Sequence, residues 1–358
     1  MIIAGGGTGG HLFPGIAVAR ELARRGASVS FVGSDYGIER TAVPRAGFEV
    51  DLLSIRGVRG EGWAGVARAF RRVPASVAAA LRLLRRRDPG LVIGVGGYAS
   101  FPAVAAAALR RVPIVLLEQN AAPGLATRLL APLAARVCVS FPATARVLGR
   151  RALVTGNPVR TSGVAGSRRE RAAGEPFRVL VFGGSAGAHR LNEVVPTALA
   201  QVGRPLAVTH QTGPRDRDTV EEAYRALGVA ARTVAFIDDM ESAYAEADLV
   251  VCRAGATTIA ELTALGLPAI LVPFPYAAGD HQRLNAEALV EAGAAWMLAD
   301  RELSPDAVSA LVRRAIDDPA ALAAMAERAR GLGRPDAAAR VADECFRLVG
   351  ATAAGASA

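Results

Sequence analysis

A cluster of five glycines near the amino terminus most constrains how this chain can fold. Apolar residues 2–4 lead directly into Gly5–Gly10, and apolar residues then recur at helical spacing at Ile16, Ala19 and Leu22. This order predicts a strand, a tight loop and a helix. Glycines let backbone N–H groups approach an anion closely, and the amino terminus of the helix adds positive partial charge. The stretch therefore predicts a loop that binds a phosphate-bearing ligand.

The same arrangement recurs in the second half of the chain. Apolar residues 179–182 lead into a second glycine loop at 183–187, and aligning His189 with His11 aligns the two loops. Strands alternate with helices in both halves, which is the pattern of parallel, doubly wound sheets. We therefore expect an α/β protein with two Rossmann-like domains that face each other across a cleft.

Length and local composition predict the domain boundaries. A chain of 358 residues is too long for one ordinary core and suits two domains. Residues 161–176 contain few apolar side chains, so the linker is expected there. We assign 1–160 to the first domain and 161–334 to the second. A helix at about 335–349 is expected to pack back on the first domain, and the Gly, Ala, Ser and Thr residues of 350–358 are expected to be disordered.

Composition excludes several classes of protein. The 42 basic residues are all arginine, and without lysine neither a Walker A phosphate loop nor a pyridoxal Schiff base is possible. The three scattered cysteines favour neither disulfides nor a zinc site, which indicates a reducing cytosol. No apolar run is long enough for a spanning helix, and the first residues belong to a strand rather than a signal peptide. The all-arginine usage is explained by a GC-rich genome, and the net charge of +9 has a functional meaning only with an anionic partner or a membrane surface.

Two histidines follow the glycine loops directly. His11 lies where its imidazole would point into the cleft, so it is a candidate general base or phosphate ligand. His189, its counterpart, could equally be a helix cap or a surface residue.

A second candidate site begins at Gly255. Two threonines follow it at the start of a predicted helix, and Glu261 lies one to two turns further on. A carboxylate there could accept hydrogen bonds from the vicinal hydroxyls of a ribose. The alternative is that Glu261 only stabilises the helix dipole.

Two other patterns point to different chemistry. The first loop also satisfies G-x-G-x-x-G, and Asp35 lies where a nicotinamide enzyme places its ribose-binding acid. Asp216 and Asp218 form a D-x-D sequence of the kind that holds a metal in many sugar-nucleotide enzymes. Acidic residues are also enriched at helix starts in general, so we expect no metal site.

Seven motifs, spread over residues 1 to about 350, resemble one known family in combination. They are Gly6-Gly-Thr-Gly-Gly-His with Phe13-Pro-Gly after it, Gly96-Gly-Tyr with Phe101-Pro, Glu118-Gln-Asn, Gly156-Asn-Pro-Val-Arg, Gly183-Gly-Ser, Phe236-Ile-Asp-Asp-Met and Arg253 to Glu261. With these motifs the chain resembles the MurG family, the N-acetylglucosaminyltransferases of peptidoglycan synthesis, which serve cell shape and cell division.

The resemblance implies a GT-B architecture, in which the second domain holds most of UDP-GlcNAc and the first domain most of the acceptor. It implies inverting transfer of N-acetylglucosamine to the C4 hydroxyl of lipid-linked muramyl-pentapeptide, without a metal or other cofactor. His11 is our candidate base. The donor contacts carried over are Thr8, Gly9, Gly10, Asn120, Arg160, Ser185, Ile237, Ala256, Thr257, Thr258, Ile259, Ala260, Glu261 and Gln282.

Three other functions remain open at this point. A glycolipid synthase or a UDP-sugar epimerase could share the architecture, and a nicotinamide-dependent oxidoreductase fits the first loop alone.

An acceptor on a polyprenyl diphosphate obliges the enzyme to meet a membrane. The segment from Trp63 to Arg87 combines aromatic and aliphatic residues with seven arginines, which suits anionic head groups. The alternative is that its apolar residues form domain core. We expect peripheral association with the cytoplasmic face of the cell membrane and no nucleic acid partner.

Overall fold

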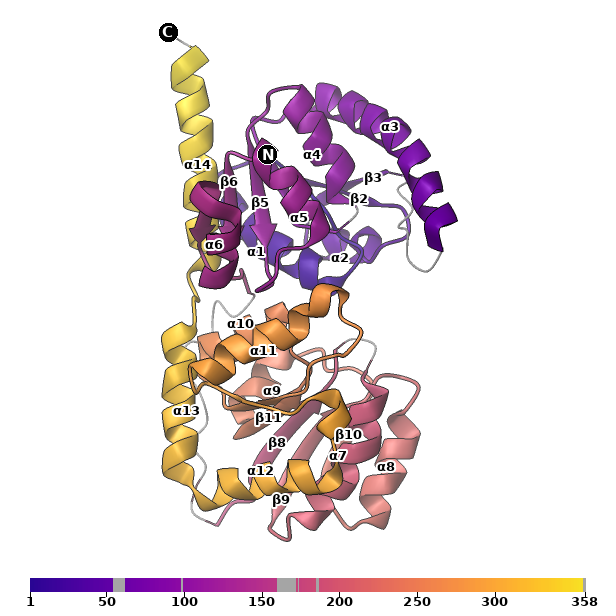
Figure 1. Ribbon diagram of the computed structural model, residues 1–358, viewed down its shortest axis with the longest axis vertical. Coiled ribbons are helices and arrows are strands. Elements are labelled where there is room, and N and C mark those ends of the chain that lie inside the picture. Colours follow the sequence, from indigo (N-terminus) through magenta and orange to yellow (C-terminus); the bar gives the residue numbers. More distant parts are fainter. Residues whose placement is uncertain (54–61, 98, 160–171, 173, 185–186, 357–358) are drawn as a thin grey trace. The chain divides into compact units, whose positions relative to one another are not determined.

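The chain forms two compact units, each built on its own sheet (Figure 1). Unit 1 consists of Met1–Arg160 together with Pro335–Ala358, and unit 2 of Thr161–Arg334. Most of the linker expected at 161–176 lies outside the described residues. The computed structural model describes residues 1–53, 62–97, 99–159, 172, 174–184 and 187–356, with the backbone alone at 62–72 and 351–356.

Unit 1 contains a seven-stranded parallel sheet in the order β3-β2-β1-β4-β5-β6-β7. Its strands are β1 (Ile2–Ala4), β2 (Ser30–Ser34), β3 (Glu49–Leu53), β4 (Val92–Gly94), β5 (Ile114–Glu118), β6 (Arg136–Val139) and β7 (Ala152–Val154). Its helices are α1 (Gly9–Arg24), α2 (Glu39–Arg45), α3 (Gly62–Arg87), α4 (Ser100–Leu109), α5 (Leu125–Leu130), α6 (Pro142–Leu148) and α14 (Ala337–Ala356), with 3₁₀ turns at Ala131–Leu133 and Gly149–Arg151.

Both faces of this sheet are buried. Successive strand residues point to opposite faces, so Ala4 packs in a cluster with Leu84 of α3, while Ile3 packs in another with Leu12 of α1. Helices on both faces explain why the central strands β1 and β4 are apolar throughout rather than alternating, whereas the edge strand β3 is partly exposed. Apolar residues of α3 such as Leu84 therefore belong to the core, as the second of the two interpretations of the segment from Trp63 to Arg87 predicted.

Helix α14 belongs to unit 1 although it comes from the end of the chain. It buries Val341, Ala342 and Cys345 in the same cluster as Leu12. We expected disorder from Gly350, but α14 continues to Ala356. Alanine has the highest helix propensity, and the alanines after Gly350 extend a helix that is already nucleated.

Unit 2 contains a six-stranded parallel sheet in the order β10-β9-β8-β11-β12-β13. Its strands are β8 (Phe177–Phe182), β9 (Leu206–Gln211), β10 (Ala231–Val234), β11 (Leu249–Cys252), β12 (Ala269–Leu271) and β13 (Trp296–Met297). Its helices are α7 (His189–Gln201), α8 (Arg217–Ala226), α9 (Met240–Glu246), α10 (Ala256–Leu265), α11 (His281–Glu291), α12 (Pro305–Asp317) and α13 (Pro319–Leu332), with 3₁₀ turns at Ala278–Asp280 and Asp300–Glu302.

The two sheets share one topology. Counted from its first strand, each has the order 3-2-1-4-5-6, to which unit 1 adds a seventh strand. This is the Rossmann order. The predicted α/β class and the two doubly wound units are thus confirmed.

Candidate functional site

The strand order of each sheet reverses beside its first strand, and open α/β sheets bind ligands at the carboxyl ends of strands at such a point. In unit 1 the reversal lies between β1 and β4, and the loops that follow these strands are Gly5–Thr8 and Gly96–Gly97. In unit 2 it lies between β8 and β11, followed by Gly183–Ala188 and Arg253–Gly255. Of the predicted site residues, Thr8, Gly9, Gly10 and His11 lie in or beside the first of these loops, and Ala256 to Glu261 follow the loop after β11.

His11 lies in the first turn of α1, against the loop after β4. Its Nδ1 is 3.0 Å from Oγ1 of Thr8, the residue that directly precedes α1. A Cβ at Gly96 would lie 2.7 Å from Cδ2 of His11, so only glycine leaves room for the ring. The structure therefore brings Thr8 and His11 of the first glycine motif together with Gly96 of the loop after β4.

The hydrogen bond between Thr8 and His11 bears on the proton chemistry of the ring. If Nδ1 donates to the threonine oxygen, Nε2 carries the lone pair and can accept a proton. If the hydroxyl donates instead, Nε2 carries the hydrogen and cannot act as a base. A basic role for His11 thus requires Thr8 to act as the acceptor. Gly9 and Gly10, also predicted as donor contacts, open α1 beside these residues.

Asn120 is held by the buried carboxylate of Glu118 at the end of β5. Oε1 of Glu118 accepts from the Asn120 backbone N–H at 3.1 Å, and Oε2 accepts from Gly124 N–H at 2.9 Å. Thr144 Oγ1 donates to the Asn120 carbonyl at 2.9 Å. Glu118 therefore acts as the anchor of this loop and presents Asn120 at the carboxyl edge of the sheet.

In unit 2, the predicted run Ala256 to Glu261 forms the first two turns of α10. The helix begins after Gly255 without a side chain capping its amides. Ile259 points into the core and is 3% exposed, whereas Thr257 and Thr258 are partly exposed. A ligand at this helix terminus would therefore meet backbone N–H groups and threonine hydroxyls.

Glu261 forms a hydrogen bond within the protein that the sequence did not suggest. Its Oε2 accepts a hydrogen bond from the hydroxyl of Tyr244 at 2.8 Å, and Tyr244 is a buried residue of α9. The hydroxyl therefore orients the carboxylate.

Gln211 connects the second glycine loop with Ile237. Its Nε2 donates to the Gly184 carbonyl at 2.9 Å, and its Oε1 accepts from Ile237 N–H at 2.8 Å. The predicted contact Ile237 is thereby fixed beside the loop after β8. Sequence reasoning missed Gln211, although a polar residue at the carboxyl end of a strand is the signal that could have identified it.

The buried side chain of Arg253 holds the segment after β12 and Asp300. Its Nη1 is 2.6 Å from Oδ1 of Asp300 and donates to the carbonyls of Val272 and Pro273, each at 3.2 Å. The segment after β12 is also held by the predicted contact Gln282, whose Oε1 accepts from Phe274 N–H at 2.9 Å. This hydrogen bond uses the amide oxygen of Gln282, so a contact from this side chain to a ligand would be made by Nε2.

The D-x-D aspartates do not share a site. Asp216 Oδ2 accepts from Asn192 Nδ2 at 2.7 Å and lies 3.0 Å from Nδ1 of His189, whereas the Asp218 side chain is 94% exposed. The hydrogen bonds from Asn192 and then His189 lower the pKa of Asp216, and Asp216 in turn raises the pKa of His189. His189 thus pairs with Asp216. Across the described ranges, no group of three or more His, Cys, Asp or Glu residues could hold a metal ion.

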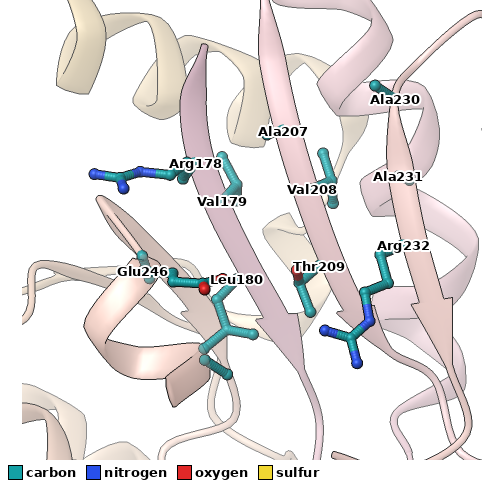
Figure 2. A pocket seen from close by; sticks show the side chains of 12 residues that line it. Arg178, Val179, Leu180, Ala207, Val208, Thr209, Ala230, Ala231, Arg232 and Glu246 are labelled. Carbon is teal, nitrogen blue, oxygen red and sulfur yellow. The ribbon is translucent and has the colours of Figure 1, made fainter. Parts of the chain in front are cut away.

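A hollow of about 420 Å³ in unit 2 lies away from these loops (Figure 2). Arg178, Thr209 and Arg232 line it from β8, β9 and β10, and Glu246 from α9. Arg178 and Arg232 are second residues of their strands, so the hollow opens at the amino-terminal half of the sheet. It is no part of the candidate site.

Two predicted donor contacts, Arg160 and Ser185, lie outside the described residues.

Comparison with known proteins identifies the family. Residues 1–139 match the glycosyltransferase family 28 N-terminal domain, and residues 178–341 match the glycosyltransferase family 28 C-terminal domain. The first match covers the loops after β1 and β4, and the second covers those after β8 and β11.

Individual relatives span nearly the whole chain. The UDP-N-acetylglucosamine–N-acetylmuramyl-(pentapeptide) pyrophosphoryl-undecaprenol N-acetylglucosamine transferase of Pelobacter propionicus is 46% identical, covering 96% of this chain and 98% of its own. The crystal structure of Acinetobacter baumannii MurG superimposes with a TM-score of 0.81 at 31% identity, covering 97% of this chain and 98% of its own. A UDP-GlcNAc 2-epimerase from Neisseria meningitidis shares only the fold, with a TM-score of 0.68 at 12% identity over 97% of this chain and 98% of its own. The resemblance indicated by the motifs is confirmed, and the chain belongs to glycosyltransferase family 28.

Proposed function

We infer that this protein transfers N-acetylglucosamine from UDP-GlcNAc to the C4 hydroxyl of a lipid-linked muramyl-pentapeptide, a step of peptidoglycan synthesis. The observation that carries this inference is 46% identity to a transferase of that name over 96% of the chain. The UDP-sugar epimerase likeness, at 12% identity, extends to the fold alone and does not support the alternative. The reaction is a single in-line displacement that inverts the anomeric centre.

The donor side of this proposal rests on unit 2. The uncapped start of α10 and the carboxylate of Glu261 suit a ribose with two vicinal hydroxyls. The glycine loop before α7 suits a diphosphate, because negative charge grows on the departing UDP and a helix amino terminus stabilises it.

The acceptor side rests on unit 1. His11 accepts the proton of the attacking hydroxyl through Nε2 while Nδ1 donates to Thr8. Asn120, held by Glu118 at the same edge of the sheet, is a contact that unit 1 contributes to the donor rather than to the acceptor.

One assay tests the reaction class. Purified protein should release UDP from UDP-GlcNAc only when a lipid-linked muramyl-pentapeptide is added. An epimerase would convert the donor without an acceptor, and an oxidoreductase would not consume it. UDP release that is independent of the acceptor, or is equally fast with a diacylglycerol acceptor, would contradict the proposal.

The same acceptor places the enzyme at a membrane, and we propose that it binds peripherally to the anionic cytoplasmic face. No helix in the described parts of the chain is both long and apolar enough to cross a bilayer. Arg85 and Arg86 are exposed at the end of α3, and neither forms an ion pair with the described residues. Arg87 differs, because it is held by Asp51 and Glu49, each at 2.9 Å.

Replacing Arg85 and Arg86 together by glutamine should weaken co-sedimentation with anionic vesicles about thirtyfold at low salt, since each basic residue near such a surface contributes roughly 1 kcal/mol. UDP affinity should stay the same. Glutamine at Arg225 and Arg301 removes the same charge from exposed positions of unit 2 and serves as the control. Equal binding of the wild type to neutral and anionic vesicles would exclude the electrostatic surface.

A further inference from the structure

The first glycine loop already contains a negative charge supplied by the protein itself. Glu39, the first residue of α2, is 0% exposed. Its Oε2 accepts from Gly7 N–H at 2.9 Å, and its Oε1 accepts from both the backbone N–H and the hydroxyl of Ser34 at 2.7 Å. Three donors from two segments thus converge on one buried carboxylate.

The surrounding glycines make the space for this carboxylate. A Cβ at Gly6 would lie 2.5 Å from both the carboxyl carbon and Oε2 of Glu39, and Cβ atoms at Gly33 and Gly37 would also collide with the Glu39 side chain. Three glycines, one in the first loop, one in β2 and one just before α2, are therefore required by one side chain. Gly6 also has a φ of +149°, which few other residues adopt.

Glu39 remains charged at neutral pH. Burial acts to raise its pKa, but the hydrogen bonds from Gly7 and from the Ser34 side chain and backbone outweigh burial, so the pKa lies below its ordinary value. A carboxylate among converging N–H and O–H donors is the arrangement by which a glycine loop binds an external anion.

We propose that Glu39 is a positioning residue that fills the anion site of the first glycine loop and so fixes Thr8 and His11 for the reaction. Gly7, whose N–H it binds, directly precedes Thr8, and Thr8 holds the His11 ring. A Cβ at Gly97 would lie 2.7 Å from the Gly6 carbonyl, so the loop after β4 packs on the same peptide. The Gly7 amide therefore binds no phosphate of a ligand.

On this proposal the Gly7 amide of the first loop is not offered to a ligand phosphate, which differs from the expectation that both glycine loops bind one. The proposal also argues against the nicotinamide reading of the first loop, in which the loop amides bind a pyrophosphate. In unit 2, among the residues that the structure describes, no carboxylate accepts from Gly183, Gly184 or Gly187, and Gly187 N–H donates to the Gly184 carbonyl instead. The two loops are alike in sequence, but only the first binds a carboxylate of the described residues.

The inference rests on the proposed transferase activity, and variants of Glu39 test it. Glu39→Gln cannot accept from all three donors, and we expect kcat to fall about ten- to a hundredfold while the affinity for UDP stays within threefold. Glu39→Ala should behave similarly and leave a hole lined by donors. Formate or acetate should then restore kcat with saturation, whereas chloride at equal ionic strength and acetamide should not.

The control is Glu21→Ala, which removes an α1 carboxylate that binds Arg24 and Arg25. It should keep kcat within threefold and show no response to formate. A folded Glu39→Gln protein with wild-type kcat would overturn the inference, as would a Glu39→Ala protein that acetamide rescues as well as acetate. If the wild type releases no UDP with the lipid-linked acceptor, the proposed function fails instead.

A measurement on the wild type covers the case in which the variants do not fold. The Gly7 amide should exchange slowly with solvent although it lies in a surface loop, and its NMR resonance should not move when inorganic phosphate is added. Rapid exchange, or a saturable shift with phosphate, would show that the amide is open to external anions.

Discussion

Replacing His11 with alanine should lower kcat by about 10² to 10⁴, because that is the range that a positioned general base contributes. The affinity for UDP should change much less, since the imidazole touches the proton of the acceptor rather than the nucleotide. Steady-state kinetics with a lipid-linked acceptor, together with calorimetric titration of UDP, separates the two effects.

Two further variants make this result specific. His189→Ala removes the histidine at the corresponding position of unit 2, whose ring pairs with Asp216, and should cost less than about tenfold in kcat. Thr8→Val keeps the shape of the loop but removes the partner of Nδ1, so kcat should fall by an intermediate factor. If His11→Ala keeps more than a tenth of wild-type turnover, or if only UDP affinity falls, the base lies elsewhere.

Replacing Glu261 with alanine should weaken UDP binding roughly 10- to 100-fold, since charge-assisted hydrogen bonds to a ribose are worth about 1.5–3 kcal/mol. The fold should persist, because Glu261 is only partly buried on α10. Isothermal titration with UDP measures the loss, and thermal unfolding checks the fold.

Tyr244→Phe is the matched control for Glu261. It removes the hydroxyl that donates to Oε2 at 2.8 Å and leaves the carboxylate in place. UDP affinity should then fall less than about threefold. An unchanged affinity in Glu261→Ala would show that the carboxylate serves only the contact between α9 and α10.

The fold was predictable because its signals are local. The glycine-rich sequences at 5–10 and 183–187 follow β1 and β8, and strands that alternate with helices lead to parallel sheets. The two-residue strand β13 carries no pattern of its own and depends on pairing with β12. The helix at 350–356 was missed because glycine and small residues suggested disorder, while the preceding turns of α14 favour continuation.

For the candidate site, the sequence suggests only those residues whose type reveals their own chemistry. His11 and Glu261 have side chains that suit a base and a ribose ligand, and they follow glycine loops. Glu39 gives no such signal, because an acid at a helix start normally indicates dipole stabilisation, and its partner Gly7 is 32 residues away. Gln211 and Tyr244 likewise act through contacts made only after the sheets form.

Unit 1 combines segments from before and after unit 2, which has a consequence for protein synthesis. The ribosome releases Ile16 and Leu22 of α1 before unit 2, but the residues that cover them, such as Val341 and Cys345 of α14, emerge only after the whole of unit 2. Unit 2 can complete its sheet in the meantime, whereas one apolar face of unit 1 stays open to other chains. Nascent unit 1 is therefore the part of this protein most in need of a chaperone during translation.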